Sequence, residues 1–210
     1  MKSGTSQCRH FVSLFIIAIG CQTGLFAGLE FAAERGVSKS QRDNRLERVV
    51  KEYEFPSWKG RTREKYVRPL QALDISTISI PTGKIEIVIL NEHLSRGSRI
   101  DVLTKDGEKN LVMAFAHVAP DIESAQKWML ESFAYSTVRA SGITLCEMGD
   151  RGYEAPFKDE GFITFVRNNV HVHVRCWGGY SPRAIARQID ELILKQSRTP
   201  EKKWWHFFSR

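Results

Sequence analysis

The stretch from Gly149 to Leu194 constrains the fold most, because it reads as a β-hairpin that leads directly into a helix. Two runs rich in β-branched and aromatic residues, Phe162–Arg167 and Val170–Cys176, flank Asn168-Asn169. Asparagine accepts left-handed backbone geometry more readily than most residues, so this dipeptide predicts a two-residue turn. Such a turn pairs the end of the first strand with the start of the second and fixes the register of the hairpin.

The two faces of this predicted hairpin differ in polarity, because successive side chains of a strand point to opposite sides. One face is apolar and carries Ile163, Phe165, Val170, Val172 and Val174. The other face carries Thr164, Val166, His171, His173 and Arg175. We therefore expect the first face in the core and the second on the outside of the sheet.

The helix after the hairpin has clear start signals. Gly178-Gly179 ends the second strand, Ser181 is a suitable N-cap residue, and Pro182 suits the first helical position. Its buried stripe is predicted to consist of Ile185, Ile189, Leu192 and Ile193.

Two more hairpins are predicted upstream, starting near Leu73. Ile78 and Ile80 alternate with polar residues, a turn follows at 81–83, and Ile85–Ile89 alternates again. Strands at Arg99–Thr104 and Leu111–His117 flank Asp106-Gly107, a strong turn signal.

A helix over Pro120–Tyr135 and strands beginning at Ile143–Met148 complete the element order. This order predicts one α+β domain over residues 71–195. We expect a mostly antiparallel sheet of hairpins with two helices packed on one face, preceded by an N-terminal signal or anchor segment.

Residues 1–33 form that signal or anchor segment: a basic start is followed by an uncharged run from Phe11 to Leu29. Three outcomes remain open. Cleavage after Ala27 or Ala33 would release an exported protein. Ala18–Cys21 resembles a lipoprotein box, which makes Cys21 a lipidation candidate, and the uncharged run is also long enough to span a bilayer uncleaved.

The position of the basic charge bears on both topology and partners. The net charge of +7 comes from the flanks, since residues 34–70 carry +5, residues 196–210 carry +3, and residues 71–195 carry −2. A nucleic-acid-binding domain needs its basic patch on the fold itself, so no nucleic-acid partner is expected. Basic flanks suit an anionic membrane surface, although basic residues after an uncleaved helix would favour a domain facing the cytoplasm.

The two flanks are expected to be interfacial. Residues 34–70 are predicted to be a basic linker with a short amphipathic helix at Gln41–Tyr53, either solvated or resting Tyr53, Phe55 and Trp58 on lipid headgroups. Residues 196–210 are a basic, aromatic tail that folds back on the domain or inserts at a membrane interface. Its candidate membrane contacts are Trp204, Trp205, Phe207 and Phe208.

Two cysteines belong to the predicted domain, and no pair of cysteines has the spacing of a zinc or redox site. In an exported chain Cys146 and Cys176 are candidates for a disulfide. In a cytosolic chain they are expected as buried thiols.

No catalytic motif is recognised, and no cofactor is expected. The candidate ligand-binding surface is the hairpin's outer face together with the loop at 149–153, and its candidate residues are Asp150, Arg151, His171, His173 and Arg175. His171 and His173 are also the candidate metal ligands, with a third ligand to come from His117, Glu147 or Asp150.

The sequence therefore predicts an extracytoplasmic, membrane-associated binding or interaction module, secreted, periplasmic or anchored. Its partners are expected to be a membrane surface and an unidentified protein or small-molecule ligand. Two alternatives remain: a metal-dependent hydrolase that uses His171 and His173, and a membrane-anchored domain that faces the cytoplasm.

Overall fold

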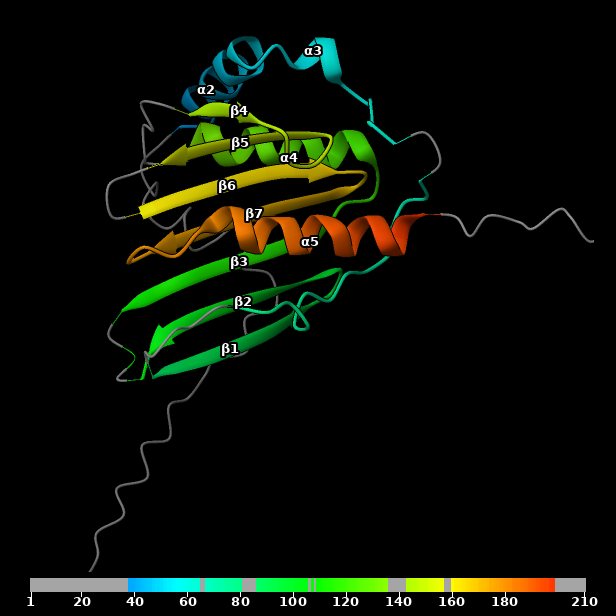
Figure 1. Cartoon of the computed structure of the whole chain (residues 1–210). Helices are drawn as coiled ribbons and strands as arrows, with labels where there is room; N and C mark the ends of the chain where they lie inside the picture. Colours follow the sequence, from blue (N-terminus) through cyan, green and yellow to red (C-terminus); the bar gives the residue numbers. More distant parts are fainter. Residues whose placement is uncertain are drawn as a thin grey trace, which may run out of the picture. The chain divides into compact units, whose positions relative to one another are not determined.

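Seven antiparallel strands form one sheet, as the computed structural model of the chain shows (Figure 1). The structure describes residues 38–64, 67–80, 86–105, 107, 109–135, 143–156 and 160–198. The strands are β1 (Ile87–Leu94), β2 (Gly97–Thr104), β3 (Asn110–Val118), β4 (Thr144–Cys146), β5 (Arg151–Pro156), β6 (Glu160–Arg167) and β7 (Val170–Trp177). Their order across the sheet is β1-β2-β3-β7-β6-β5-β4, so β1 and β4 are the edges.

The hairpin predicted around Asn168-Asn169 is confirmed as β6 and β7. Arg167 pairs with Val170, and Phe165 pairs with Val172, as the two-residue turn requires. Asn168 takes the left-handed conformation with φ of 55°, which is the property that made asparagine a turn signal here. This hairpin lies at the centre of the sheet, between β3 and β5.

The two upstream hairpins have different outcomes. The second is confirmed, because β2 and β3 pair around the loop that contains Gly107. The first is wrong: residues 78–80 form no strand, and the predicted turn at 81–83 lies outside the described residues. The strand after it, β1, pairs instead with β2 through the turn at Ser95-Arg96.

Four helices occur among the described residues: α2 (Lys39–Glu52), α3 (Phe55–Trp58), α4 (Ile122–Tyr135) and α5 (Pro182–Ser197). The α+β class is confirmed, but α4 and α5 do not share a face of the sheet. α5 packs with Phe165 and α4 packs with Val166, two neighbouring residues of β6 that point to opposite sides. Figure 1 shows α5 in front of the sheet and α4 behind it, which corrects the prediction of both helices on one face.

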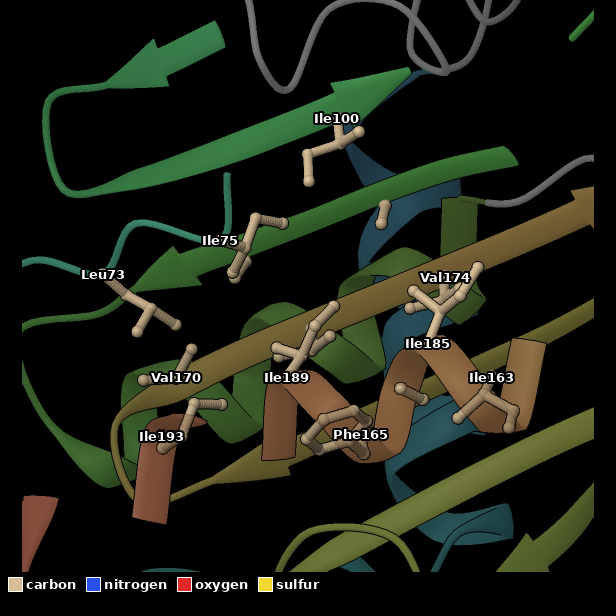
Figure 2. Close-up of a cluster of buried hydrophobic side chains, with 14 of the residues drawn as sticks. Leu73, Ile75, Ile100, Ile163, Phe165, Val170, Val174, Ile185, Ile189 and Ile193 are labelled. Carbon is tan, nitrogen blue, oxygen red and sulfur yellow. The ribbon is translucent and has the colours of Figure 1, made fainter. Parts of the chain in front are cut away.

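The larger core lies between the sheet and α5 (Figure 2). The predicted apolar face of the hairpin is confirmed here, because Ile163, Phe165 and Val174 are almost fully buried against Ile185 and Ile189. The segment 70–75, which precedes the first predicted hairpin, closes the same core with Leu70, Leu73 and Ile75.

The smaller core joins α4 to α2 and α3, so the packed unit begins well before residue 71. The amphipathic helix predicted at Gln41–Tyr53 is confirmed as α2, and Ser38 caps it through a reciprocal pair of bonds with Gln41. Phe55 and Trp58 are buried in this core. They therefore do not rest on lipid headgroups, and residues 38–64 are part of the fold rather than a solvated linker.

Several predicted features lie outside the described residues. These are the signal or anchor segment 1–33 with Cys21, and the tail with Trp204, Trp205, Phe207 and Phe208. Among the described helices, none has the length and apolar character that crossing a bilayer requires.

Candidate functional site

α4 covers much of the outer face of the β6–β7 hairpin, so this part is not the exposed surface that the sequence predicts. Arg175, near the end of β7, is 25% exposed and pairs with Glu160. Thr164 is fully buried and His171 is 4% exposed. Next to His171 on β3 lies His117, whose ring stacks on Trp128 of α4 at 4.6 Å between centroids. These polar residues therefore lie in a second buried layer, between the sheet and α4. The polarity of the strand alone does not predict this burial.

The Nε2 atom of His171 has a hydrogen-bond partner inside this layer. Its Nε2 lies 3.1 Å from the Thr164 hydroxyl, which itself donates to the Val172 carbonyl at 3.0 Å. Because the hydroxyl hydrogen is used in that bond, the hydroxyl oxygen accepts from Nε2–H of His171. Burial, followed by repulsion from His173 and His117, lowers the pKa of His171 to about 3.

His173 lies one step along the same face in an aromatic setting. Its ring stacks on Phe115 at 5.3 Å and on Phe162 at 5.7 Å between centroids. Burial and the neighbouring Arg175 lower its pKa to about 4. Within the described part of the chain, no group of three histidine, cysteine or carboxylate side chains is arranged to hold a metal ion.

The candidate residues of the 149–153 loop are engaged within the fold. The side chain of Asp150 is 3% exposed, and Arg167 donates to it at 3.2 Å. Arg151 donates from Nε to the Tyr153 hydroxyl at 2.9 Å, and its guanidinium lies over the Trp58 ring at 5.5 Å. Both side chains therefore hold the fold together, and neither is presented on an open ligand-binding loop.

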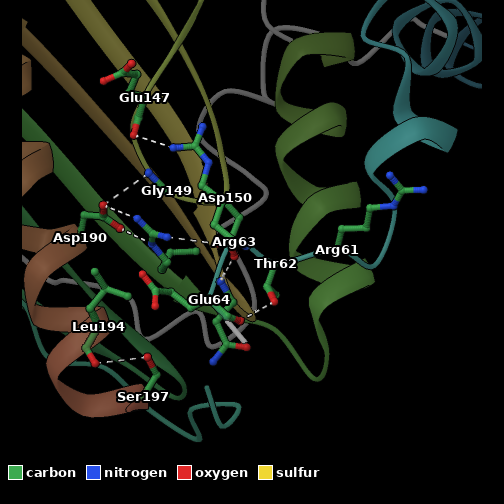
Figure 3. A network of polar contacts seen from close by, with 12 residues as sticks. Arg61, Thr62, Arg63, Glu64, Glu147, Gly149, Asp150, Asp190, Leu194 and Ser197 are labelled. Carbon is green, nitrogen blue, oxygen red and sulfur yellow. Dashed lines mark hydrogen bonds and ion pairs between the residues drawn. The ribbon is translucent and has the colours of Figure 1, made fainter. Parts of the chain in front are cut away.

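Asp150 belongs to a buried salt-bridge cluster with Arg167 and Asp190. Arg167 donates from Nε and Nη2 to the two oxygens of Asp190, at 2.7 and 2.8 Å, and so ties β6 to α5. Figure 3 shows how segment 61–64 and the 147–150 loop meet at this cluster. Three backbone amides complete it: Asn168 N–H and Arg63 N–H donate to Asp150 at 2.6 and 2.8 Å, and Gly149 N–H donates to Asp190 at 3.4 Å.

The loop reaches this cluster because position 149 is glycine. Gly149 has φ of +65°, and a Cβ at this position would lie 2.3 Å from the Val166 carbonyl oxygen. A side chain there would push the loop away from β6, so Gly149 sets the close approach that brings Asp150 to Arg167. The side chains of this cluster therefore bind one another, and they stabilise the fold.

Cys146 and Cys176 are both free thiols, and the sheet topology rules out a bond between them. They lie on β4 and β7, and β5 and β6 run between these strands. Three strand spacings separate their strands by about 14 Å, whereas a disulfide needs Cα atoms within about 7 Å. The predicted disulfide is therefore corrected, and export gains no support from it.

We expect the two thiols to react with a maleimide at different rates in the folded protein. Burial raises the pKa of both thiols, that of Cys176 to about 12, so both are poor nucleophiles near neutral pH. Cys146 is partly exposed and should label first, whereas Cys176 should label only on unfolding. Mass spectrometry of peptides from a timed labelling experiment measures both rates. A non-reduced peptide that links Cys146 to Cys176 would contradict the fold.

An exposed surface that the sequence analysis missed lies along edge strand β1. Val88, Ile89 and Leu90 are 39%, 48% and 52% exposed, and they are consecutive in the strand. The signal was present in the sequence, because the four residues Ile87–Leu90 are all apolar and do not follow a one-sided strand pattern. The alternation of Ile85, Ile87 and Ile89 instead predicts a hairpin with one buried face, whereas Ile89 is 48% exposed.

Among the described residues, no segment pairs with the outer side of β1, which leaves a row of backbone hydrogen-bonding groups there. In an antiparallel pair alternate residues bond to the neighbouring strand, and the Glu86 carbonyl accepts from Lys105 N–H at 3.0 Å on the β2 side. Counting from Glu86, the even-numbered residues of β1 face β2, and Ile87, Ile89, Asn91 and His93 direct their N–H and C=O groups to the open edge. This edge is a template for one more strand.

Natural edge strands are usually short or carry proline, lysine or a bulge that prevents further pairing. β1 has eight residues, contains neither proline nor lysine, carries Glu92 only near its end, and pairs with β2 without a register shift. The opposite edge, β4, has only three residues. β1 is therefore the candidate functional site. Comparison of the chain with protein-family models, with curated proteins and with solved structures yields no match.

Proposed function

We propose that this chain is an extracytoplasmic, membrane-associated interaction module that binds a partner protein by adding a strand to β1. The observation that carries the proposal is the unprotected edge: an eight-residue strand with three consecutive exposed apolar side chains. Strand addition combines main-chain hydrogen bonds for affinity with contacts of alternate side chains for specificity. The occupant is therefore an extended segment with apolar side chains opposite Val88, Ile89 and Leu90.

Association with a membrane is supported by the charge pattern at both ends of the chain. α2 packs on α4 through Val49 and the residues near it. Its exposed basic residues recur every third position: Lys39, Arg42, Arg45, Arg48 and Lys51. Because a helix turns about 100° per residue, these side chains wind around α2, and Arg48 and Lys51 lie on the side away from its buried stripe, where their charge suits anionic lipid headgroups.

The test of strand addition is Ile89→Pro in the full chain. Because the Ile89 N–H points to the open edge, proline removes a donor that the partner needs and leaves the β1–β2 bonds in place. We expect the variant, extracted in mild detergent, to lose the larger native complex that the unaltered chain forms. Leu145→Lys on the opposite edge is the control and should leave the complex unchanged. Equal native masses for the unaltered chain and Ile89→Pro would reject β1 as the binding edge.

The proposed location has its own test. We expect the intact mass of the membrane-extracted chain to show loss of residues up to Ala27 or Ala33, or a lipid on Cys21. Each of these results places the folded unit outside the cytoplasm. An unmodified N-terminus, together with protection of the folded unit from protease added outside the cell, would instead establish the cytoplasm-facing topology.

A further inference from the structure

We infer that the strand added to β1 is β1 of a second copy of this chain, in an antiparallel pair about a two-fold axis at Ile89. This inference rests on the proposed function and names its partner. A two-fold interface must be self-complementary, because the same patch lies on both sides. The question is whether the β1 edge meets this condition.

The register centred on Ile89 pairs apolar residues with one another. Ile89 faces Ile89 of the second copy, and its free N–H and C=O groups exchange two hydrogen bonds there. Val88 faces Leu90 of the second copy, and Leu90 faces Val88. The three most exposed apolar side chains of β1 are therefore covered by the same three side chains.

Other symmetric registers pair the strands less well. A two-fold axis perpendicular to the sheet leaves each side chain on the same face of the sheet. In a symmetric antiparallel pair this axis therefore passes midway between one residue and the same residue of the second copy. Centring the axis on Leu90 moves Val88 opposite Glu92, and Ile89 opposite Asn91. Only the Ile89 register brings the exposed apolar residues of both copies together.

The Ile89 register brings like charges together at the strand ends. Glu86 faces Glu92 of the second copy, which is unfavourable. Lys105 lies on the other side of Glu86 at 2.6 Å and partly offsets this contact. Arg99, the β2 neighbour of Glu92, is itself paired with Asp101 at 2.6 Å, so the apolar pairing at the centre of the strand must carry the register.

Cysteine cross-linking in the full chain tests the register. In a hydrogen-bonded antiparallel pair the Cα atoms lie about 5.5 Å apart, within the range of a disulfide, so Ile89→Cys should give a reducible dimer on mild oxidation. In the same register the two Leu90 Cα atoms lie roughly 8 Å apart, so Leu90→Cys should cross-link little. The unaltered chain, with its own four cysteines, gives the background.

Light scattering of the full chain in mild detergent measures the association itself. We expect a concentration-dependent dimer, and Ile89→Pro should weaken it about 5- to 150-fold, the effect of losing two backbone hydrogen bonds. A cross-link through Leu90→Cys in place of Ile89→Cys would overturn the register. A monomer at every concentration, with no cross-link from either cysteine, would overturn self-association. If self-association were absent but Ile89→Pro still abolished the native complex in extracts, the proposed strand addition would hold, with a different protein as the partner.

Discussion

Arg167→Met should lower the free energy of unfolding by about 3–5 kcal/mol, because it leaves two buried carboxylates without their cation. The Arg167 side chain is 8% exposed, and those of Asp150 and Asp190 are 3% and 12% exposed. Arg183→Met is the matched control, since Arg183 also binds one carboxylate through two donors but is 63% exposed. Urea unfolding should give about 0–1 kcal/mol for the control.

The double variant Arg167→Met/Asp190→Leu tests the reason for this loss. Replacing both partners of a buried pair by apolar groups often costs little, whereas removing one partner leaves an uncompensated charge. We therefore expect the double variant to be more stable than Arg167→Met alone. A double variant that is less stable would mean that the Arg167–Asp190 bond itself, and not the stranded carboxylate, supplies the stability.

Acid should destabilise the fold through His171 well above the pH at which this residue itself becomes charged in the folded state. Its pKa is 6.5 in an ordinary setting and about 3 in the fold, so the contribution of neutral His171 is complete above pH 6.5. Below pH 6.5 the unfolded chain binds a proton that the folded chain excludes, and stability falls continuously towards pH 3. At pH 5 the loss from His171 alone is about 2 kcal/mol.

Unfolding curves of the unaltered chain and of His171→Gln between pH 7 and pH 5 measure this effect. The variant has lower stability at pH 7, because it disturbs the bond to Thr164, but its stability should fall less steeply with acid. His93→Gln is the control, since the His93 side chain is 70% exposed and not buried. Equal slopes for the unaltered chain and His171→Gln would contradict a neutral, buried His171.

Local signals in the sequence determined the central hairpin and the helix after it. Asn168-Asn169 specified the turn because asparagine tolerates the left-handed conformation that residue 168 takes. Once the turn is fixed, strand alternation fixes the register and places Phe165 and Val172 on one face. The stripe of α5, with Ile185 and Ile189, follows from helical spacing in the same way.

The sequence did not reveal which polar residues are buried, because burial depends on elements far along the chain. His171 lies on a polar strand face, and only the position of α4 makes that face an interior layer. Asp150 and Arg151 follow a glycine in a short loop, which predicts exposure, yet Arg167 and Trp58 enclose them. In the sequence Cys146 and Cys176 are candidates for a disulfide, but the order of the strands places them too far apart.

The same limit explains why the candidate site was missed. The alternation of Ile85–Ile89 predicts a strand, but a strand is an edge only relative to the order of all the others. By itself, the sequence determined the Asn168-Asn169 turn, the register of the β6–β7 hairpin and the apolar stripe of α5, because these depend on residues close together in the chain. The tertiary structure alone decided that the polar hairpin face is covered and the apolar edge is open, because both depend on which distant elements meet.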